Sequence, residues 1–195
     1  MKILLTGATG KVGSRLTKRL AQRGDQVRAL VRDEARAAGL RDDRIELVEG
    51  DLLEADSLAA AVRGVDAVVH CAAFFRGATP EQAHAVNDLG TQNLASAARA
   101  ASVRRFIFTS TGLVYGSNGG RLDAPSPAHR LYHVVDDESP DLATLFASVG
   151  ALPPDGSNAE NARAFDALLD GRRIREELGF KPLFPRLADA LAAGA

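Results

Sequence analysis

The sequence contains few of the residues that build disulfide frameworks and metal sites. Its 195 residues include one cysteine, Cys71, and no tryptophan. A single cysteine excludes an internal disulfide and any Cys-x-x-Cys metal site. No group of His, Cys or carboxylate residues has the spacing of metal ligands either, so we expect no bound metal.

The chain also lacks a strong net charge and a long hydrophobic run. Its formal net charge is −1, with 46% hydrophobic and 25% charged residues. This balance is typical of a folded globular protein and offers no basic field that would hold nucleic acid or an anionic membrane. The apolar stretch at the N-terminus ends at Gly7, which is too short for a signal peptide or a membrane span. We therefore expect a soluble, cytoplasmic protein with neither nucleic acid nor membrane as a partner.

Tyrosine and lysine are scarce. The two tyrosines are Tyr115 and Tyr132, and none of the four lysines lies between Lys18 and Lys181. A mechanism that needs a tyrosine and a lysine side by side consequently has very few candidates in this chain.

The first half of the chain alternates short β-branched runs with segments of helical length. This alternation predicts a parallel sheet covered by helices, a Rossmann-type doubly wound α/β fold. The apolar residues Val12, Leu16 and Leu20 recur at helical spacing, and Gly24 follows as a helix stop. The expected strands are residues 2–6, 26–31, 45–48, 66–70 and 106–109.

Two further helices have start signals in the sequence. Asp56 or Ser57 can cap a helix that runs through residue 63 and ends at Gly64. Thr79-Pro80-Glu81-Gln82 has the pattern of a capping box with proline at the first helical position. It predicts a long helix to about Ala101.

The second half is less regular. Residues 116–130 are rich in Gly, Pro and Ser and indicate an irregular connection. A strand is expected at 132–135, and a short helix begins at Ser139. Further helices are expected at 159–169, at 172–178 before Gly179, and after Pro185. We expect a dinucleotide-binding core at 1–121 and a shortened C-terminal segment at 122–195 that packs on it.

A glycine-rich turn joins the first expected strand to the first helix. The amides at a helix N-terminus are unsatisfied and carry a positive dipole, so a pyrophosphate is their natural ligand. Small residues allow the phosphate to approach the main chain. A structural turn is the alternative, and Lys11 could equally be an ordinary exposed lysine. The candidate phosphate-binding residues are Gly7, Thr9, Gly10, Lys11, Val12 and Gly13.

The end of the second strand usually selects the cofactor. An acid there binds the ribose hydroxyls of NAD, whereas an arginine can neutralise the additional phosphate of NADP. Arg32 directly follows the strand and favours NADP, while Asp33, 20 residues after Gly13, favours NAD. Counting strand residues places Val31 or Arg32 at the tip, so NADP is preferred. The alternative is that Arg32 and Asp33 are a solvated surface pair.

Several motifs occur in an order that resembles the extended short-chain dehydrogenase/reductase family, which includes sugar-nucleotide epimerases, dehydratases and dihydroflavonol-type reductases. They span the first 116 residues, and parts of the tail, such as Tyr132-His133-Val134-Val135, also resemble that family. The motifs are Thr6-Gly7-Ala8-Thr9-Gly10-Lys11-Val12-Gly13, Gly50-Asp51-Leu52, His70-Cys71-Ala72-Ala73, Val86-Asn87-Asp88-Leu89-Gly90-Thr91-Gln92-Asn93-Leu94 and Phe108-Thr109-Ser110-Thr111-Gly112-Leu113-Val114-Tyr115-Gly116.

The resemblance implies roles for individual residues. Thr111 falls where the family keeps the Ser or Thr that hydrogen-bonds the reacting hydroxyl or carbonyl, and Asn87 would be a helix residue near the site. As alternatives, Asp51 could cap the following turn, Cys71 could be a small buried hydrophobe, and Asn87 could satisfy helix backbone. The residues implied in cofactor contact are Asp51 and Leu52 at the adenine and Cys71, Ala72 and Ala73 beyond the pyrophosphate.

The chain departs from that family at its proton relay. The family uses Tyr-x-x-x-Lys, whose spacing places both side chains on one helix face. Here Gly119 lies four residues after Tyr115 and Asp136 four after Tyr132, so neither tyrosine has the lysine. Resemblance is continuous to about Pro125 and resumes near residue 129, without the catalytic helix between.

These features define the functional expectation. We expect an NADP(H)- or NAD(H)-binding protein that resembles oxidoreductases and isomerases acting on a hydroxyl or ketone, for example of a sugar nucleotide. Its catalytic competence is open, and the alternative is a catalytically silent sensor or partner protein. A sheet edge left uncovered by the absent segment would favour a homodimer.

Overall fold

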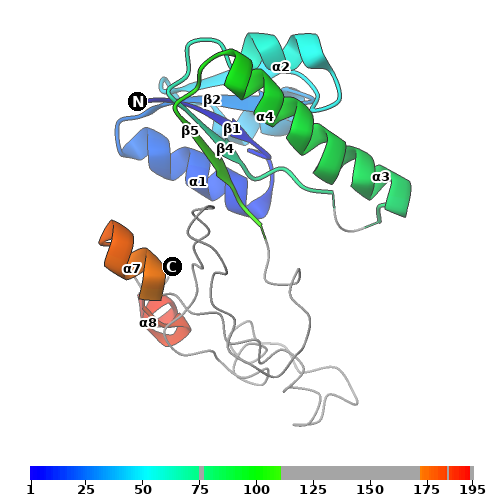
Figure 1. Cartoon of the computed structure of the whole chain (residues 1–195). Helices are drawn as coiled ribbons and strands as arrows, with labels where there is room; N and C mark the ends of the chain where they lie inside the picture. Colours follow the sequence, from blue (N-terminus) through cyan, green and yellow to red (C-terminus); the bar gives the residue numbers. More distant parts are fainter. Residues whose placement is uncertain (75–76, 111–171, 184, 194–195) are drawn as a thin grey trace. The chain divides into compact units, whose positions relative to one another are not determined.

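Five parallel strands form the centre of the computed structural model (Figure 1). The structure describes residues 1–74, 77–110, 172–183 and 185–193. The strand order is β3-β2-β1-β4-β5, so the chain builds outward in both directions from β1. This arrangement confirms the predicted doubly wound α/β sheet, with boundaries within one residue of those expected. The strands are β1 Lys2–Thr6, β2 Gln26–Val31, β3 Ile45–Glu49, β4 Ala67–His70 and β5 Arg105–Phe108.

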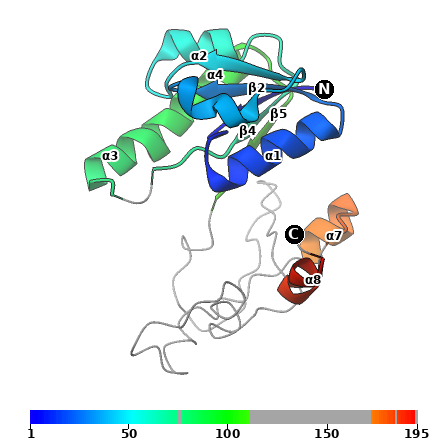
Figure 2. The ribbon, with the colours of Figure 1, turned by 180° about the vertical axis from the view of Figure 1, so that it is seen from behind.

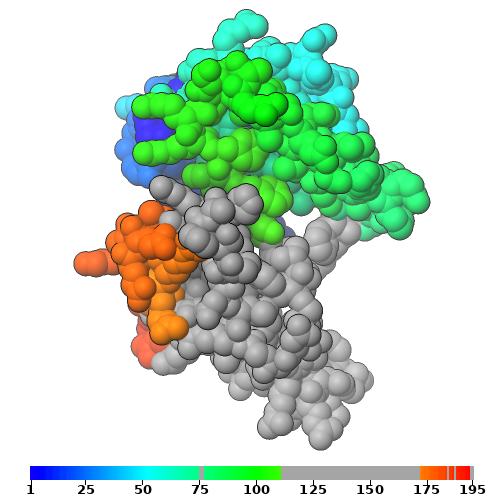
Figure 3. Space-filling model, viewed as in Figure 1, coloured from blue at the N-terminus to red at the C-terminus, as the bar shows by residue number. Residues whose placement is uncertain are grey.

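Helices cover both faces of the sheet. Helix α1 lies on one face, and α2 and α4 lie on the other, as the two opposite views show (Figures 1 and 2). The predicted long helix is present as three consecutive pieces, in which a π-helical turn, η2, joins α3 to α4. It runs along the surface in the space-filling view (Figure 3). The helical elements of this unit are α1 Lys11–Gln22, η1 Ala35–Leu40, α2 Ala55–Ala61, α3 Pro80–His84, η2 Ala85–Leu89 and α4 Gly90–Ala100.

The core has two halves, one on each face of the sheet. On the α1 face, Ile3 and Leu5 of β1 pack with Leu20 of α1. On the other face, Leu4 packs with Leu58 and Leu94 from α2 and α4. Consecutive residues of β1 are therefore all buried, which explains why the strand is a continuous apolar run without alternation.

The apolar stripe of α1 is shorter than predicted. Leu20 is buried and Leu16 packs against the core, but Val12 is 63% exposed. Val12 lies in the first turn of the helix, next to the glycine loop, and does not pack against the core. Gly24 has a φ of +95° directly after the helix, which is the left-handed conformation expected of a glycine stop.

Of the two predicted helix caps, the one at Thr79 is confirmed and the one at Asp56 or Ser57 is wrong. At α3, Gln82 N–H donates to Thr79 Oγ1 at 3.3 Å and Thr79 N–H donates to Gln82 Oε1 at 3.0 Å, which confirms the capping box. At α2 the prediction is wrong, because the N-cap is Glu54 and makes no side-chain cap hydrogen bond. Ser57 instead donates its hydroxyl to backbone carbonyls of the preceding loop.

Residues Met1–Ser110 form one compact unit, and the described C-terminal residues belong to a second. The second unit contains α7, Arg172–Leu178, followed by Gly179 with a φ of +61°, and α8, Leu187–Ala192. Both helices are as predicted. The elements expected at 116–130, 132–135, 139 onward and 159–169 lie outside the described residues. In the part of the chain that the structure describes, no helix is long and apolar enough to cross a membrane.

Candidate dinucleotide site

The glycine loop between β1 and α1 is packed so closely that side chains do not fit. Gly7 has a φ of +72°, and a Cβ there would lie 2.6 Å from the backbone nitrogen of Ala72. A Cβ on Gly13 would clash with the carbonyl oxygen of Gly7, which also accepts a hydrogen bond from Gly10 N–H at 3.0 Å. Glycine at 7 and 13 thus lets the loop, the start of α1 and the segment after β4 meet.

The N-terminus of α1 presents free backbone donors. Gly10 is the N-cap and makes no side-chain cap hydrogen bond, and the first turn contains no acidic residue. The N–H groups of Lys11, Val12 and Gly13 have no acceptor within the helix, because the first turn lies ahead of the i−4 ladder. Together with the helix dipole, these donors suit a phosphate group.

A pocket of about 230 Å³ opens at the carboxyl ends of the central strands. It lies where the strand order reverses between β1 and β4, the place where ligands bind in open α/β sheets. Nine of the twelve residues predicted from the sequence to bind the cofactor line it. The pocket-lining residues are Thr6, Gly7, Thr9, Gly10, Leu30, Val31, Arg32, Gly50, Asp51, Leu52, Cys71, Ala72, Ala73, Phe74 and Val86.

The other three predicted residues contribute in different ways. Gly13 is buried beneath the loop, where its lack of a side chain permits the packing described above. Lys11 and Val12 line a separate groove along α1 with Arg15, Leu16 and Arg19. Lys11 and Val12 can therefore serve the pocket through their backbone amides.

Arg32 and Asp33 follow β2 but have different surroundings. Arg32 is exposed and lines the pocket. Asp33 does not line it, and its Oδ1 accepts a hydrogen bond from Ala35 N–H at 2.8 Å at the start of η1. One oxygen of the Asp33 carboxylate is thus engaged in a local turn, while Arg32 lies at the pocket.

The loop after β3 forms another wall of the pocket. Asp51 lines it and also accepts a hydrogen bond at Oδ1 from Leu53 N–H at 2.9 Å, so both sequence interpretations of Asp51 are compatible with the structure. Leu52 is buried, and a Cβ on Gly90 of α4 would lie 2.9 Å from its Cβ. Asn93 Nδ2 donates to the carbonyl of Leu52 at 3.1 Å. The close approach at Gly90 therefore brings α4 against this wall.

The segment after β4 is held by an asparagine that the sequence placed only near the site. Asn87 Oδ1 accepts from Phe74 N–H at 2.7 Å, and Asn87 Nδ2 donates to Phe74 O at 3.0 Å. Phe74 and Val86 line the pocket and were not identified from the sequence. The signal that could have found them is position, since Phe74 follows Ala73 directly and Val86 precedes Asn87.

A chain of hydrogen bonds runs beneath the pocket through the buried His70. Thr91 Oγ1 donates to Asn87 O at 2.6 Å, so the 2.9 Å contact between His70 Nε2 and Thr91 Oγ1 is donated by the histidine. Nδ1 is then unprotonated and accepts from Thr6 Oγ1 at 2.6 Å, while Thr6 Oγ1 accepts from Ala72 N–H at 3.3 Å. Burial lowers the pKa of His70 below its ordinary value of 6.5, which agrees with a neutral ring.

Cys71 lies at the pocket, as predicted, whereas the structure does not describe Thr111. Cys71 Sγ lies 3.3 Å from Thr109 Oγ1 at the end of β5 and lines the pocket. Thr111, the predicted partner of the reacting hydroxyl or carbonyl, lies outside the described residues. Among the residues that the structure does describe, no three His, Cys, Asp or Glu side chains are placed to hold a metal ion.

Comparisons with known proteins show the family of the chain. A family model described as NAD(P)H-binding matches residues 7–141, more than half of the chain. The 2-alkyl-3-oxoalkanoate reductase of Stenotrophomonas maltophilia is 33% identical over an alignment that covers 100% of this chain and 57% of the relative. Sterol demethylase protein B of Methylococcus capsulatus is 38% identical over 60% of this chain and 37% of the relative. The chain thus spans little more than half, or less, of these relatives.

A solved structure supports the same assignment. A short-chain dehydrogenase/reductase superfamily protein from Agrobacterium tumefaciens, with bound NAD, is 38% identical, with a TM-score of 0.51 over 60% of this chain and 35% of that one. The family-model match, residues 7–141, begins at the first glycine of the loop described above. From the family match and this common architecture, the chain belongs to the NAD(P)H-binding family of short-chain dehydrogenase/reductase-like proteins.

Proposed function

We propose that this NAD(P)-binding chain takes NADP(H) in preference to NAD(H). The observation that carries the proposal is the contrast between Arg32 and Asp33. Arg32 is exposed at the pocket, where a guanidinium can pair with the additional phosphate of NADP, whereas Asp33 hydrogen-bonds the backbone of Ala35. An acid that selects NAD must reach the ribose hydroxyls, whereas Asp33 does not line the pocket and one of its oxygens is engaged in a turn.

The described residues fit a dinucleotide. The pyrophosphate would lie on the backbone amides of residues 11–13, because the close packing at Gly7 and Gly13 leaves this helix start free of side chains. Asp51 and Leu52 would contact the adenine, and Cys71, Ala72 and Ala73 would line the cofactor beyond the pyrophosphate. When bound, the nicotinamide would supply or accept hydride.

We further propose that the chain acts mainly as a dinucleotide-binding sensor or partner protein. The chain has the backbone donors for a phosphate at residues 11–13 and the adjoining pocket. However, neither tyrosine of the sequence is followed by lysine at the spacing of the family's proton relay. Without that relay, hydride transfer lacks the proton exchange that completes reduction of a carbonyl. Binding needs only the part of the site that the chain retains.

The second candidate is a reductase or epimerase-like enzyme for a hydroxyl or ketone substrate. It is favoured by the match to a 2-alkyl-3-oxoalkanoate reductase, which extends along the whole chain. This function requires a proton donor other than the Tyr and Lys pair, with Thr111 as the family catalytic position retained.

A side-by-side titration with NADPH and NADH, followed by the fluorescence of the nicotinamide, tests the cofactor proposal. We expect tighter binding of NADPH, and Arg32→Ala should remove most of the difference, by about tenfold. Arg36→Ala, an exposed arginine on η1, is the matched control and should retain the preference. Asp33→Ala should leave NADH affinity unchanged. If Asp33→Ala weakens NADH and Arg32→Ala leaves NADPH unaffected, the assignment is wrong.

Turnover distinguishes the two functions. NADPH oxidation in the presence of a 2-alkyl-3-oxoalkanoate, followed by absorbance, should not exceed that of a protein-free control if the chain is a binding protein. Cofactor-dependent oxidation that Thr111→Ala abolishes, while NADPH still binds, would establish the enzyme and contradict the silent role.

A further inference from the structure

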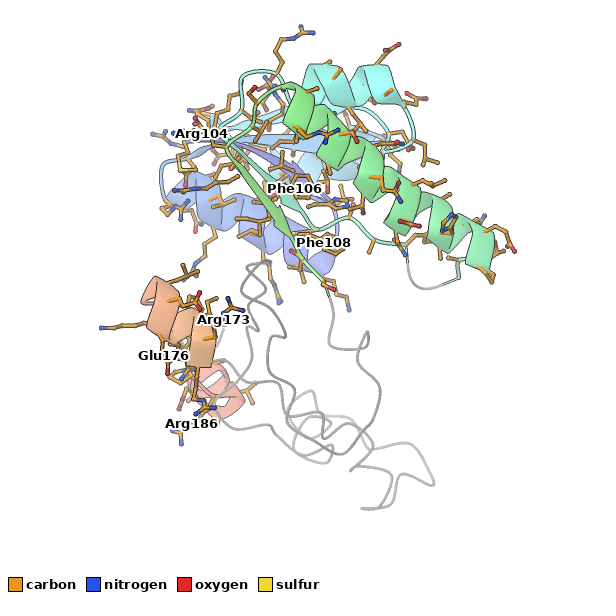
Figure 4. The ribbon with its side chains drawn as sticks, viewed as in Figure 1. Arg104, Phe106, Phe108, Arg173, Glu176 and Arg186 are labelled. Carbon is orange, nitrogen blue, oxygen red and sulfur yellow. The ribbon has the colours of Figure 1, made fainter. Side chains whose placement is uncertain are left out.

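Strand β5 ends the sheet of the described residues with apolar side chains exposed on both faces. Phe106 and Phe108 are 36% and 51% exposed, and Ile107 between them is 53% exposed. Figure 4 shows the two labelled phenylalanines along β5, with Arg104 at its start. Both rings lie near His70, at centroid distances of 6.3 and 5.5 Å, which places them on the α4 face and Ile107 on the α1 face.

The backbone of β5 is also directed outward at defined positions. Thr109 N–H donates to His70 O at 2.9 Å, so residues 105, 107 and 109 direct their backbone groups toward β4. Alternation along the strand then directs the N–H and C=O groups of Phe106 and Phe108 away from the sheet. A partner at this edge must be a strand that supplies matching donors and acceptors.

We propose that this edge pairs with β5 of a second copy of the chain, antiparallel, about a two-fold axis through Ile107. In this register Phe106 of each copy faces Phe108 of the other and exchanges both backbone hydrogen bonds with it. Ile107 faces Ile107. The two sheets join into one, with four phenylalanine rings on the α4 face and two isoleucines on the α1 face.

The apolar residues of the strand face one another in this register. A shift by one residue places side chains from opposite faces against each other. A shift of the axis to Phe106 places Arg104 of one copy opposite Phe108 of the other, although Arg104 pairs with Asp66 of its own chain at 2.8 Å. With the axis at Ile107, Arg105 faces the uncharged Thr109 of the other copy, so no like charges are opposed.

The apolar side-chain area that the pairing can bury limits the affinity of the dimer. A phenylalanine carries about 200 Å² of side-chain surface, so the exposed fractions leave roughly 500 Å² of apolar side chain to cover in the two copies together. Stable interfaces bury about 1,200–2,000 Å². The inferred dimer is therefore weak and concentration-dependent, and its backbone hydrogen bonds provide register more than affinity.

Sedimentation equilibrium of the full chain from about 5 to 500 µM tests the proposal. We expect a monomer–dimer equilibrium that Ile107→Lys weakens at least about tenfold, because it places two ammonium groups at the axis. Leu89→Lys, at a 44% exposed position of η2, is the matched control and should leave the equilibrium unchanged. A chain that stays monomeric throughout, or a dimer broken by Leu89→Lys and not by Ile107→Lys, would overturn the proposal.

A second measurement separates loss of pairing from loss of folding. Ile107→Lys and Ile107→Glu chains should each be monomeric with the circular dichroism of the wild type, and an equimolar mixture should form a heterodimer through a Lys–Glu pair at the axis. Failure of the mixture to dimerise, with both variants folded, would contradict pairing at Ile107. Monomeric wild type together with destabilised variants would show that the chain's own residues cover the edge.

Discussion

The hydroxyl of Thr6 lies 2.6 Å from Nδ1 of His70, and this contact connects the first strand of the sheet to the wall of the dinucleotide pocket. Thr6 also accepts a hydrogen bond from Ala72 N–H, and His70 Nε2 donates to Thr91 of α4. A neutral His70 with its proton on Nε2 satisfies every member of this chain. Protonation of Nδ1 would remove the acceptor that Thr6 uses.

Stability should therefore decrease in mild acid through His70. Burial lowers the folded pKa of His70, so below pH 6.5 the unfolded chain takes up a proton that the folded chain does not. The free energy of unfolding falls as the pH drops below 6.5, by at most about 1.4 kcal/mol per pH unit from this group, until the pH passes the folded pKa. Urea unfolding between pH 5 and 7.5 measures this slope.

Two variants isolate the contribution of His70. His70→Gln removes the titrating ring and should flatten the pH dependence between pH 5 and 6.5. His70→Asn, which likewise lacks a titrating ring, should flatten it in the same way. An unchanged slope in His70→Gln would show that other groups cause the acid sensitivity.

Alanine at Gly13 should disrupt the glycine loop. Its Cβ would clash with the Gly7 carbonyl in a buried position, so we expect a loss of about 1–3 kcal/mol in the free energy of unfolding. NADPH binding should be lost as well, because the loop must move. Gly39→Ala is the control, since a Cβ there meets nothing within 4 Å and should change stability by less than about 0.5 kcal/mol. Wild-type NADPH affinity in Gly13→Ala would contradict the assignment of the glycine loop as the phosphate-binding site.

Asn87 should act by positioning the segment after β4. Asn87→Ala leaves Phe74 N–H and C=O without their partner, which should cost about 1–2 kcal/mol in stability and weaken NADPH binding. Gln92→Ala removes an exposed hydrogen bond to Asp88 on the same helix and should affect neither. Calorimetric titration of both variants with NADPH makes the comparison. Equal affinities would reduce Asn87 to a structural residue without influence on the pocket.

The sequence predicts those features that depend on local physics. The capping box at Thr79 is a contact between residues three apart, and the strands are apolar runs bounded by turns. By contrast, the cap at Asp56 or Ser57 was predicted wrongly, because Ser57 bonds the loop that follows β3. Val12 has helical spacing but lies outside the reach of the core.

The walls of the site depend on contacts between distant segments. Asn87 holds Phe74 and Asn93 holds Leu52, and both pairings follow from the packing of α4 against the sheet. No local pattern specifies these partners. The glycine loop, in contrast, was found because strand, turn and helix are adjacent in the sequence.

The most direct test of the account is the response of the backbone amides to NADPH, measured by two-dimensional ¹H–¹⁵N NMR of the labelled chain. We expect the largest shift changes at the amides of Lys11, Val12 and Gly13, with smaller ones at the pocket walls and none at Gly64, which precedes β4 at the opposite end of the strands. The pyrophosphate would then lie at the start of α1. Saturation with NADPH that leaves these three amides unshifted would contradict the central claim, wherever else the shifts appeared.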